Sequence, residues 1–284
     1  MNDNIHSNVM LVDLRISQWT ARKQDKRVSK KVADSNHVDQ RVGAYYKSLL
    51  DPAIIDGIKK LVNEARTYHY RVTLPWSDDG PRVLPSTLYF EYTRQMQDYR
   101  QRFVSEVEAL LSEYPYHREE AKRFLGSLFD EDDYPTPDKL SEKYAFNLRF
   151  TPLPRGADFR CNIPDDELDE LRKEIEQQSE ATMQRAVEDA YRRVQQVVER
   201  YVERLAKPNG VFRDSMVEGA RDLVALLPAL NVTGDERLAA ITDRLEKDLI
   251  QYDPQALRTN TGAREHAYET AKTVASDVAS VFGG

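Results

Sequence analysis

The longest stretch of this chain without a helix breaker runs from residue 164 to residue 206, and it limits the folds open to the rest. After Pro164 it contains neither glycine nor proline. Because these two residues disfavour a helix interior most, the stretch predicts one helix about 64 Å long. Its apolar residues recur at alternating steps of four and three, the spacing of a coiled-coil seam: Val187, Tyr191, Val194, Val198, Tyr201 and Leu205.

A polar interruption at residues 177–182 separates this seam from three earlier apolar residues, Leu168, Leu171 and Ile175. A register break, a kink or a part of the helix projecting beyond the body would each explain it. The apolar side chains of this seam must be buried against another surface. If the rest of the chain does not fully cover them, a homodimer follows.

Most of the remaining patterns are helical as well. Apolar periodicity of 3.6 predicts helices over residues 51–68, 86–113, 116–129, 211–230, 235–252 and 261–282. Pro115 is expected to end the second of these, so that the second and third form an αα-hairpin. Lys207–Gly210 is expected to end the long helix.

Alternation of apolar and polar residues predicts strands over 9–17 and 144–151, with residues 158–162 returning as a partner after a turn. The expected fold is mainly α with a small antiparallel sheet, an elongated helical bundle with one very long coiled-coil-like helix. The expected domains are residues 1–163 and 164–284.

Composition agrees with a helical protein and narrows its setting. Charged residues make up 31% of the chain and only 11 of 284 residues are glycine. A net charge of −7 argues against a surface that binds nucleic acid all over, but permits a local basic patch. The single cysteine, Cys161, allows no disulfide within the chain and favours the cytoplasm. No apolar run is long enough to span a bilayer.

One segment, residues 20–31, is strongly basic. It is either a solvated stretch or a contact for an anionic partner, nucleic acid or an acidic protein. Its six cationic residues are the candidate nucleic-acid-binding residues: Arg22, Lys23, Lys26, Arg27, Lys30 and Lys31.

The stretch from Thr73 to Gln95 has three prolines, a glycine and the Asp78–Asp79 pair. Turn chemistry explains all of these, but it does not explain Trp76. A tryptophan at such a corner either plugs the core or anchors a partner. The stretch is expected to be a rigid connector that also offers a docking surface, and not an active site.

Patterns that would indicate catalysis are missing. The five histidines are scattered, and the phosphate-binding, dinucleotide-binding and nucleophile-elbow motifs do not occur. The acidic loop Asp130–Asp133 leaves a Mg²⁺ site open as an alternative, although adjacent carboxylates usually stay solvated. The sequence therefore predicts no catalytic residue, no metal site and no cofactor.

Three motifs resemble those of a phage and prophage family, domain of unknown function 3150. They are YHYRVTLPWSDDGPRVLPSTLYFEY, LGSLFDEDDYP and FTPLPRGADFR, and the likeness covers nearly the whole chain. The resemblance implies a phage-encoded protein in the cytoplasm of a bacterial host. It also implies genes for a MoxR-type ATPase and a von Willebrand-type protein nearby, and it carries over no catalytic residue.

The expected function is that of a non-enzymatic, phage-encoded helical protein acting through protein–protein interaction, as a scaffold, an adaptor or an inhibitor of a host complex. Its expected partners are other proteins, a second copy of itself or a host or phage ATPase complex, and no membrane. The expected interaction residues are Trp76, Val187, Tyr191, Val194, Val198 and Tyr201.

Three alternatives stay open. The basic segment binds nucleic acid, or the acidic loop serves a metal-dependent nuclease. In the third, an acidic helix face mimics DNA and inhibits a host complex, through Asp165, Asp166, Glu167, Asp169, Glu170, Glu199 and Glu203.

Overall fold

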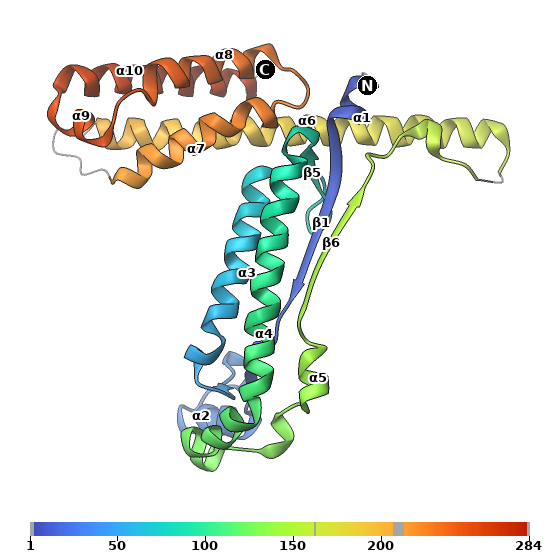
Figure 1. Ribbon diagram of the computed structural model, residues 1–284, viewed down its shortest axis with the longest axis vertical. Coiled ribbons are helices and arrows are strands. Elements are labelled where there is room, and N and C mark those ends of the chain that lie inside the picture. The colour runs from blue at the N-terminus through green and yellow to red at the C-terminus, as the bar shows by residue number, and fades with distance from the viewer. Residues whose placement is uncertain (1–2, 162, 207–212, 283–284) are drawn as a thin grey trace. The chain divides into compact units, whose positions relative to one another are not determined.

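The computed structural model describes residues 3–161, 163–206 and 213–282. Helices dominate it, and the described strands form a small four-stranded antiparallel sheet and a two-stranded ribbon (Figure 1). The predicted fold class, mainly α with a small antiparallel sheet, is confirmed.

The chain divides into two compact units that are not contiguous in sequence. The first unit holds residues 1–13, 70–90 and 149–284, and the second holds residues 14–69 and 91–148. The predicted division at 163/164 falls inside the first unit. A contiguous reading cannot find such a division, because the chain enters each unit more than once.

The first unit is built on the long helix α6 (Asp165–Leu205), which is continuous over 41 residues. It packs against α7 (Asp214–Leu230) and α10 (Thr261–Phe282) (Figure 1). Between these two come α8 (Glu236–Arg244), a π-helical turn (Leu245–Leu249) and α9 (Pro254–Thr259). The short helix α1 (Asp3–Asn8) also belongs to this unit. The stretches 207–210 and 211–212, where a helix end and a helix start were predicted, lie outside the described residues.

The seam of α6 is covered by its own chain. Tyr191, Val194, Val198 and Tyr201 are at most 1% exposed and share one apolar core with α7 and α10. The condition for a homodimer through this seam is therefore not met. Val187 and Trp76 are partly buried and pack against the same core.

The polar interruption does not break α6. Ser179 is 3% exposed, and its hydroxyl donates a hydrogen bond to the Pro154 carbonyl at 3.4 Å. The Gly156 N–H donates to the Glu176 carboxylate at 3.3 Å, and a Cβ at Gly156 would lie 2.3 Å from the Arg172 carbonyl oxygen. The loop around Pro154 and Gly156 therefore crosses close to α6. The α6 residue that faces this loop must be small, as Ser179 is, and only a glycine fits at position 156.

The predicted strand over residues 158–162 is wrong. Gly156–Asp158 form a 3₁₀ turn, residues 159–161 have no regular structure, and Asn162 lies outside the described residues. The reason is the same close approach, because a backbone held against α6 cannot return to the sheet.

The sheet instead takes two of its four strands, β4 (Leu74–Pro75) and β5 (Arg82–Pro85), from the proline-rich stretch. Its order is β4, β5, β1 (Val9–Ser17) and β6 (Ala145–Thr151). Val9 pairs with Pro85, and Leu74 pairs with Val83. The predicted strand 9–17 is confirmed. The predicted connector contains a β-hairpin, β4–β5. The sequence pattern did not predict it, because its strands are short and three prolines lie in this stretch.

The second unit centres on α3 (Pro52–Val72) and α4 (Tyr89–Leu125), whose ends extend into the first unit. The two helices lie side by side and antiparallel: Glu64 pairs with Arg102, and Tyr68 stacks on Tyr92 at 6.0 Å between ring centroids. The last helix of this unit is α5 (Pro137–Ser141).

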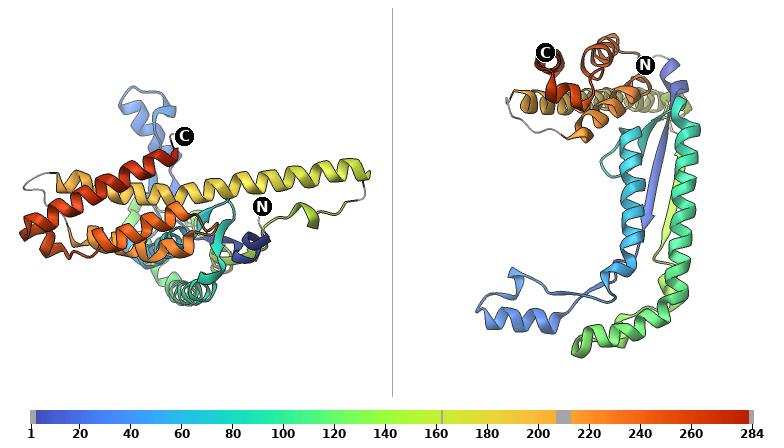
Figure 2. Two further views of the ribbon diagram at one scale, coloured as in Figure 1. Left: turned by 90° about the horizontal axis from the view of Figure 1, so that it is seen from above. Right: turned by 60° about the vertical axis from the view of Figure 1, so that its left-hand side comes forward.

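The predicted break at Pro115 is wrong, and so is the αα-hairpin. Pro115 lies inside α4, which bends towards its C-terminal end (Figure 2). Tyr114, 1% exposed, donates a hydrogen bond to the Pro135 carbonyl at 3.0 Å, and Ala121 is 2% exposed. Packing on both sides of the proline keeps the helix continuous despite the lost hydrogen bond.

Residues 22–48 form an arm on the second unit. Its elements are β2 (Arg22–Gln24), α2 (Lys26–Ser35), a 3₁₀ turn (Gln40–Val42) and β3 (Tyr46–Ser48). The arm extends away from the α3–α4 pair (Figure 2). Only Ala33 and Lys47 within it are buried, so its surface is almost wholly open to a partner.

The seam gives a direct test of the first unit's packing. Tyr201 is 0% exposed, its hydroxyl has no hydrogen-bond partner among the described residues, and burial raises its pKa to about 12. Replacing Tyr201 by Phe should therefore raise the free energy of unfolding by about 1 kcal/mol, because it removes an unsatisfied buried polar group. Replacing it by Ala should lower that free energy by about 3 to 5 kcal/mol. Urea unfolding measures both changes, and a Tyr201→Phe variant that loses stability would contradict this packing.

Candidate functional site

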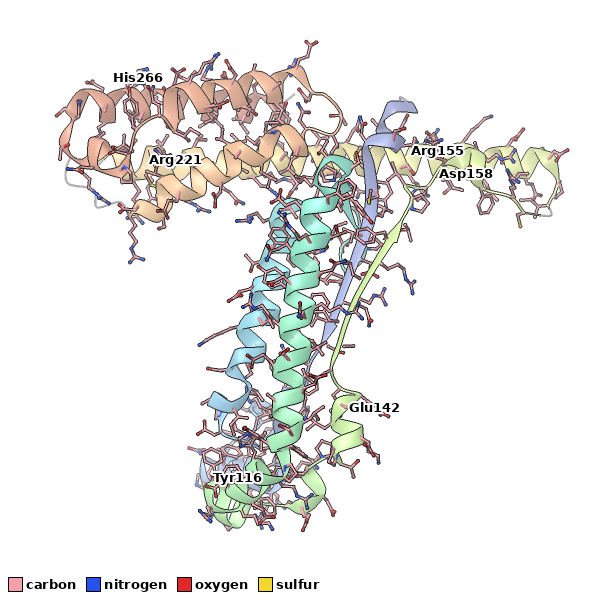
Figure 3. The ribbon with its side chains drawn as sticks, in the orientation of Figure 1. Tyr116, Glu142, Arg155, Asp158, Arg221 and His266 are labelled. Carbon is pink, nitrogen blue, oxygen red and sulfur yellow. The ribbon has the colours of Figure 1, made fainter. Side chains whose placement is uncertain are left out.

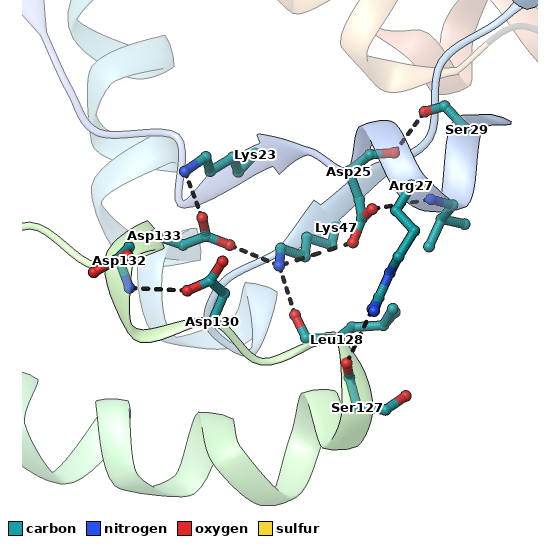
Figure 4. A network of polar contacts seen from close by, with 11 residues as sticks. Lys23, Asp25, Arg27, Ser29, Lys47, Ser127, Leu128, Asp130, Asp132 and Asp133 are labelled. Carbon is teal, nitrogen blue, oxygen red and sulfur yellow. Dashed lines mark hydrogen bonds and ion pairs between the residues drawn. The ribbon is translucent and has the colours of Figure 1, made fainter.

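The two strands β2 and β3 form the stem of the arm, and one buried carboxylate holds them together. Lys23 on β2 and Lys47 on β3 lie directly opposite each other in the antiparallel register. Like charges in that position repel. Asp133 lies between them, pairing through Oδ1 with Lys23 and through Oδ2 with Lys47 at 2.6 Å (Figure 4). Asp133 therefore converts a repulsive pair into a bridge between the strands.

Lys47 is the more buried of the two lysines, with 6% of its side chain exposed, and the Asp133 side chain is 4% exposed. The Lys47 ammonium also donates to the Leu128 carbonyl at 2.5 Å and lies 3.9 Å from Asp25 (Figure 4). A buried ammonium needs such a surround, since an unpaired charge in that place would be costly. We name Lys23, Lys47 and Asp133 the clamp.

Hydrogen bonds also fix the rest of the arm, α2 and the segment that leads into β3. Asp25 caps α2 by accepting from the Val28 N–H at 3.0 Å, and its own N–H donates to the Tyr45 carbonyl at 2.9 Å. The Ser29 hydroxyl accepts from the Tyr45 N–H at 2.9 Å. Arg27 donates to the Ser127 carbonyl at 3.2 Å (Figure 4). The arm is thus a fixed structure even though it has little core of its own.

The structure separates the six predicted basic residues into three groups. Lys23 and Arg27 serve the arm itself, as described above. Arg22 lies 5.8 Å from the centre of the Tyr46 ring. The remaining three, Lys26, Lys30 and Lys31, are exposed and form no ion pair with a described carboxylate.

Positive charge outweighs negative charge on the helix α2, although its N-cap Asp25 and Asp34 within it are acidic. Its first turn has no acidic residue and begins with Lys26 and Arg27, although the N-terminal end of a helix favours negative charge. Lys26 and Lys30, and Arg27 and Lys31, are like-charge pairs four residues apart, a spacing that costs a few tenths of a kcal/mol each. The whole arm has eight basic and three acidic residues, in a chain whose net charge is −7. Bound anions would relieve this concentration of positive charge.

Apolar side chains also lie open on the arm. Tyr45 is 41% exposed and Tyr46 is 52% exposed. Three valines are exposed as well: Val32, Val38 and Val42. Sequence reasoning identified the lysines but missed these tyrosines, for which the adjacent YY after the basic segment was the available signal.

The acidic loop has a structural role in the clamp. The Asp130 carboxylate accepts from the Asp132 N–H at 3.1 Å, while Asp133 turns inward to the two lysines. The prediction that these carboxylates stay solvated is wrong for Asp133. Across the described ranges, no group of three or more His, Cys, Asp or Glu side chains is placed to hold a metal ion.

The other predicted residues lie in the first unit. The seven acidic residues of the DNA-mimic alternative are all exposed on α6. Val187 and Tyr191 line a groove of about 570 Å³ beside α6, in which the Tyr191 hydroxyl donates to Asp235 at 2.9 Å. Among the described helices none is long and apolar enough to cross a membrane.

The comparisons with protein-family models, with curated proteins and with solved structures each found no match. The resemblance to the phage family is therefore wrong, because a family covering nearly the whole chain would match its own model. The motifs behind it are largely turn and loop residues. Here they form the β4–β5 hairpin, the acidic loop Asp130–Asp133, which we call the clamp loop, and the loop that crosses α6.

The clamp predicts a local effect of one substitution. Asp133→Asn leaves two opposed lysines without their shared carboxylate. Removal of one partner of a buried ion pair costs about 3 kcal/mol. Hydrogen exchange should therefore become about a hundredfold faster at the Asp25 and Leu49 amides, which bond to Tyr45 and Ala21 across the stem.

Asp132→Asn is the matched control for this experiment. It removes the same charge from the same loop, but the Asp132 side chain is exposed and forms no described ion pair. Its exchange rates should equal those of the wild type. Equal rates in Asp133→Asn would show that the clamp does not order the arm.

The clamp also predicts a pH dependence. Burial acts to raise the pKa of Asp133, but hydrogen bonds from Lys23 and Lys47 outweigh burial and leave that pKa below its ordinary 3.8. The unfolded arm then binds the proton more readily, so the clamp's contribution is complete above about pH 4 and is lost as pH falls through the folded pKa. Exchange at the stem amides, corrected for intrinsic rates, should rise in acid for the wild type and stay flat for Asp133→Asn.

Proposed function

We propose that this protein is a non-enzymatic binding protein that takes up single-stranded nucleic acid on its arm. One observation carries the proposal: Lys26, Lys30 and Lys31 are exposed on one short helix without described acidic partners. Closely spaced cations of this kind suit a ligand with closely spaced anions. A nucleic-acid backbone offers a negative charge at each phosphate.

The tyrosines favour a single strand over a duplex. Tyr45 and Tyr46 come after the basic helix in the chain, and both are exposed. The Arg22 guanidinium lies over the Tyr46 ring. Unpaired bases stack on exposed aromatic rings without regard to sequence, while a duplex keeps its bases stacked on each other. Cations for the backbone and rings for the bases are the two requirements of single-strand binding.

A protein partner is the second candidate, and the exposed valines are the observation that favours it. Val32, Val38 and Val42 have no role in binding a phosphate backbone. They would suit an acidic protein with an apolar contact surface. The α6 seam, which was one reason to expect a protein partner, is covered within this chain and offers no such contact surface.

Charge removal tests the nucleic-acid proposal. The triple variant Lys26→Gln, Lys30→Gln, Lys31→Gln should bind a labelled oligothymidylate more weakly. Each lost phosphate contact should lower the slope of log affinity against log salt by about 0.7, or about 2 in total. Fluorescence anisotropy over a salt series measures this slope. A wild-type protein that does not bind at low salt would contradict the proposal.

Two further variants complete this test. The triple variant Lys60→Gln, Lys173→Gln, Lys272→Gln changes the net charge equally at exposed lysines outside the arm and should keep the wild-type slope. The triple variant Val32→Ser, Val38→Ser, Val42→Ser should keep nucleic-acid binding. If the valine variant loses binding as fully as the lysine variant does, the arm recognises an apolar surface and the second candidate is favoured.

Replacing the tyrosines should change the affinity for the strand but not the salt dependence of that affinity. Replacing Tyr45 and Tyr46 by Ala should weaken binding by about 1 to 3 kcal/mol for each stacked base, with the salt slope unchanged. Affinity for an abasic oligonucleotide should respond little to this change. Equal losses for the normal and the abasic strand would exclude stacking.

A further inference from the structure

A pocket of about 390 Å³ lies beside the stem of the arm, and its volume is in the range of small-ligand sites. Its wall comes from β2, from the clamp loop and from the segment around α5. Three cationic residues and one indole line it besides the clamp: Arg22, Lys139, Lys143 and Trp19. All of these residues belong to the second unit.

The cations of the pocket converge without acidic partners. Lys139 and Lys143 are exposed, form no ion pair with a described carboxylate, and stand four residues apart. Arg22 faces the same space from another segment of the chain. Three cations on one cavity wall fit an anion with several oxygens.

The acidic side chains nearby do not cancel this charge. Asp133 lines the pocket but is committed to Lys23 and Lys47. Asp132 is the other carboxylate on the wall and has no described ion pair. Glu142 lies directly after α5 (Figure 3). Neither Glu142 nor Asp138, which belongs to α5, is among the residues that line the pocket. Lys139 and Lys143, together with Arg22 beside the Tyr46 ring, therefore face one carboxylate that has no described ion pair.

Trp19 gives the pocket an aromatic wall. Its indole is held edge-on against the Tyr114 ring at 6.1 Å between centroids and 83° between planes. Tyr114 is itself fixed by its hydrogen bond to the Pro135 carbonyl. An indole fixed in this way can stack on a flat ring without loss of its own freedom.

We infer that this pocket binds a nucleotide, with its phosphate among Arg22, Lys139 and Lys143 and its base against Trp19. The inference goes beyond strand binding on the arm, because a free mononucleotide would bind here even if Lys26, Lys30 and Lys31 bound nothing. Trp19 also provides a signal, since its fluorescence should change when the ligand binds. A Trp76→Phe background removes the only other tryptophan.

Titration with adenosine 5′-monophosphate, inorganic phosphate and adenosine tests the inference. The nucleotide should bind most tightly, phosphate more weakly and adenosine least. Lys143→Gln should weaken nucleotide binding about tenfold, the usual effect of one lost charge-assisted contact. Asp132→Asn should act in the opposite direction and tighten binding, since it removes the uncommitted carboxylate.

Other outcomes would overturn the inference. Adenosine binding as tightly as the nucleotide would exclude a phosphate site. Phosphate binding as tightly as the nucleotide would exclude stacking on Trp19. Unchanged affinity in both Lys143→Gln and Asp132→Asn, with the fold intact by circular dichroism, would exclude the pocket. The arm variant Lys26→Gln, Lys30→Gln, Lys31→Gln should leave nucleotide affinity unchanged, so this result is independent of strand binding.

Discussion

The bridge between Asp133 and the two lysines of the stem is the interaction on which the arm depends. The arm buries almost nothing of its own, so apolar packing cannot hold it in one conformation. One buried carboxylate shared by opposed lysines supplies the missing constraint. For this arm, we expect the buried ion pair to contribute more to a unique geometry than to overall stability, and that geometry is the one that the proposed function requires.

Fixing the arm in advance has a consequence for binding. Lysines on a disordered segment would lose conformational entropy on binding, whereas α2 already holds Lys26, Lys30 and Lys31 in place. The repulsion among these cations remains in the free protein and is relieved by an anion. The electrostatic cost of the arm and its proposed use are therefore two aspects of one arrangement.

Sequence reasoning predicted the features that repeat along the chain. The glycine-free run gave α6, and strict alternation gave the strand over 9–17. It failed where contacts distant in sequence decide. Pro115 stays inside α4 because both sides are packed, and residues 158–161 leave the sheet because Gly156 meets α6. Likewise, six basic residues were found, but only the fold separates Lys23, which is bound to Asp133, from the exposed Lys30.

The most direct test of a structured arm that binds single strands is hydrogen exchange of the wild-type protein with and without an oligothymidylate. Bound strand should slow exchange across residues 26–31 and 45–46 and leave α6 unchanged. Protection confined to α6, or no change anywhere in the arm while the strand is bound, would contradict it.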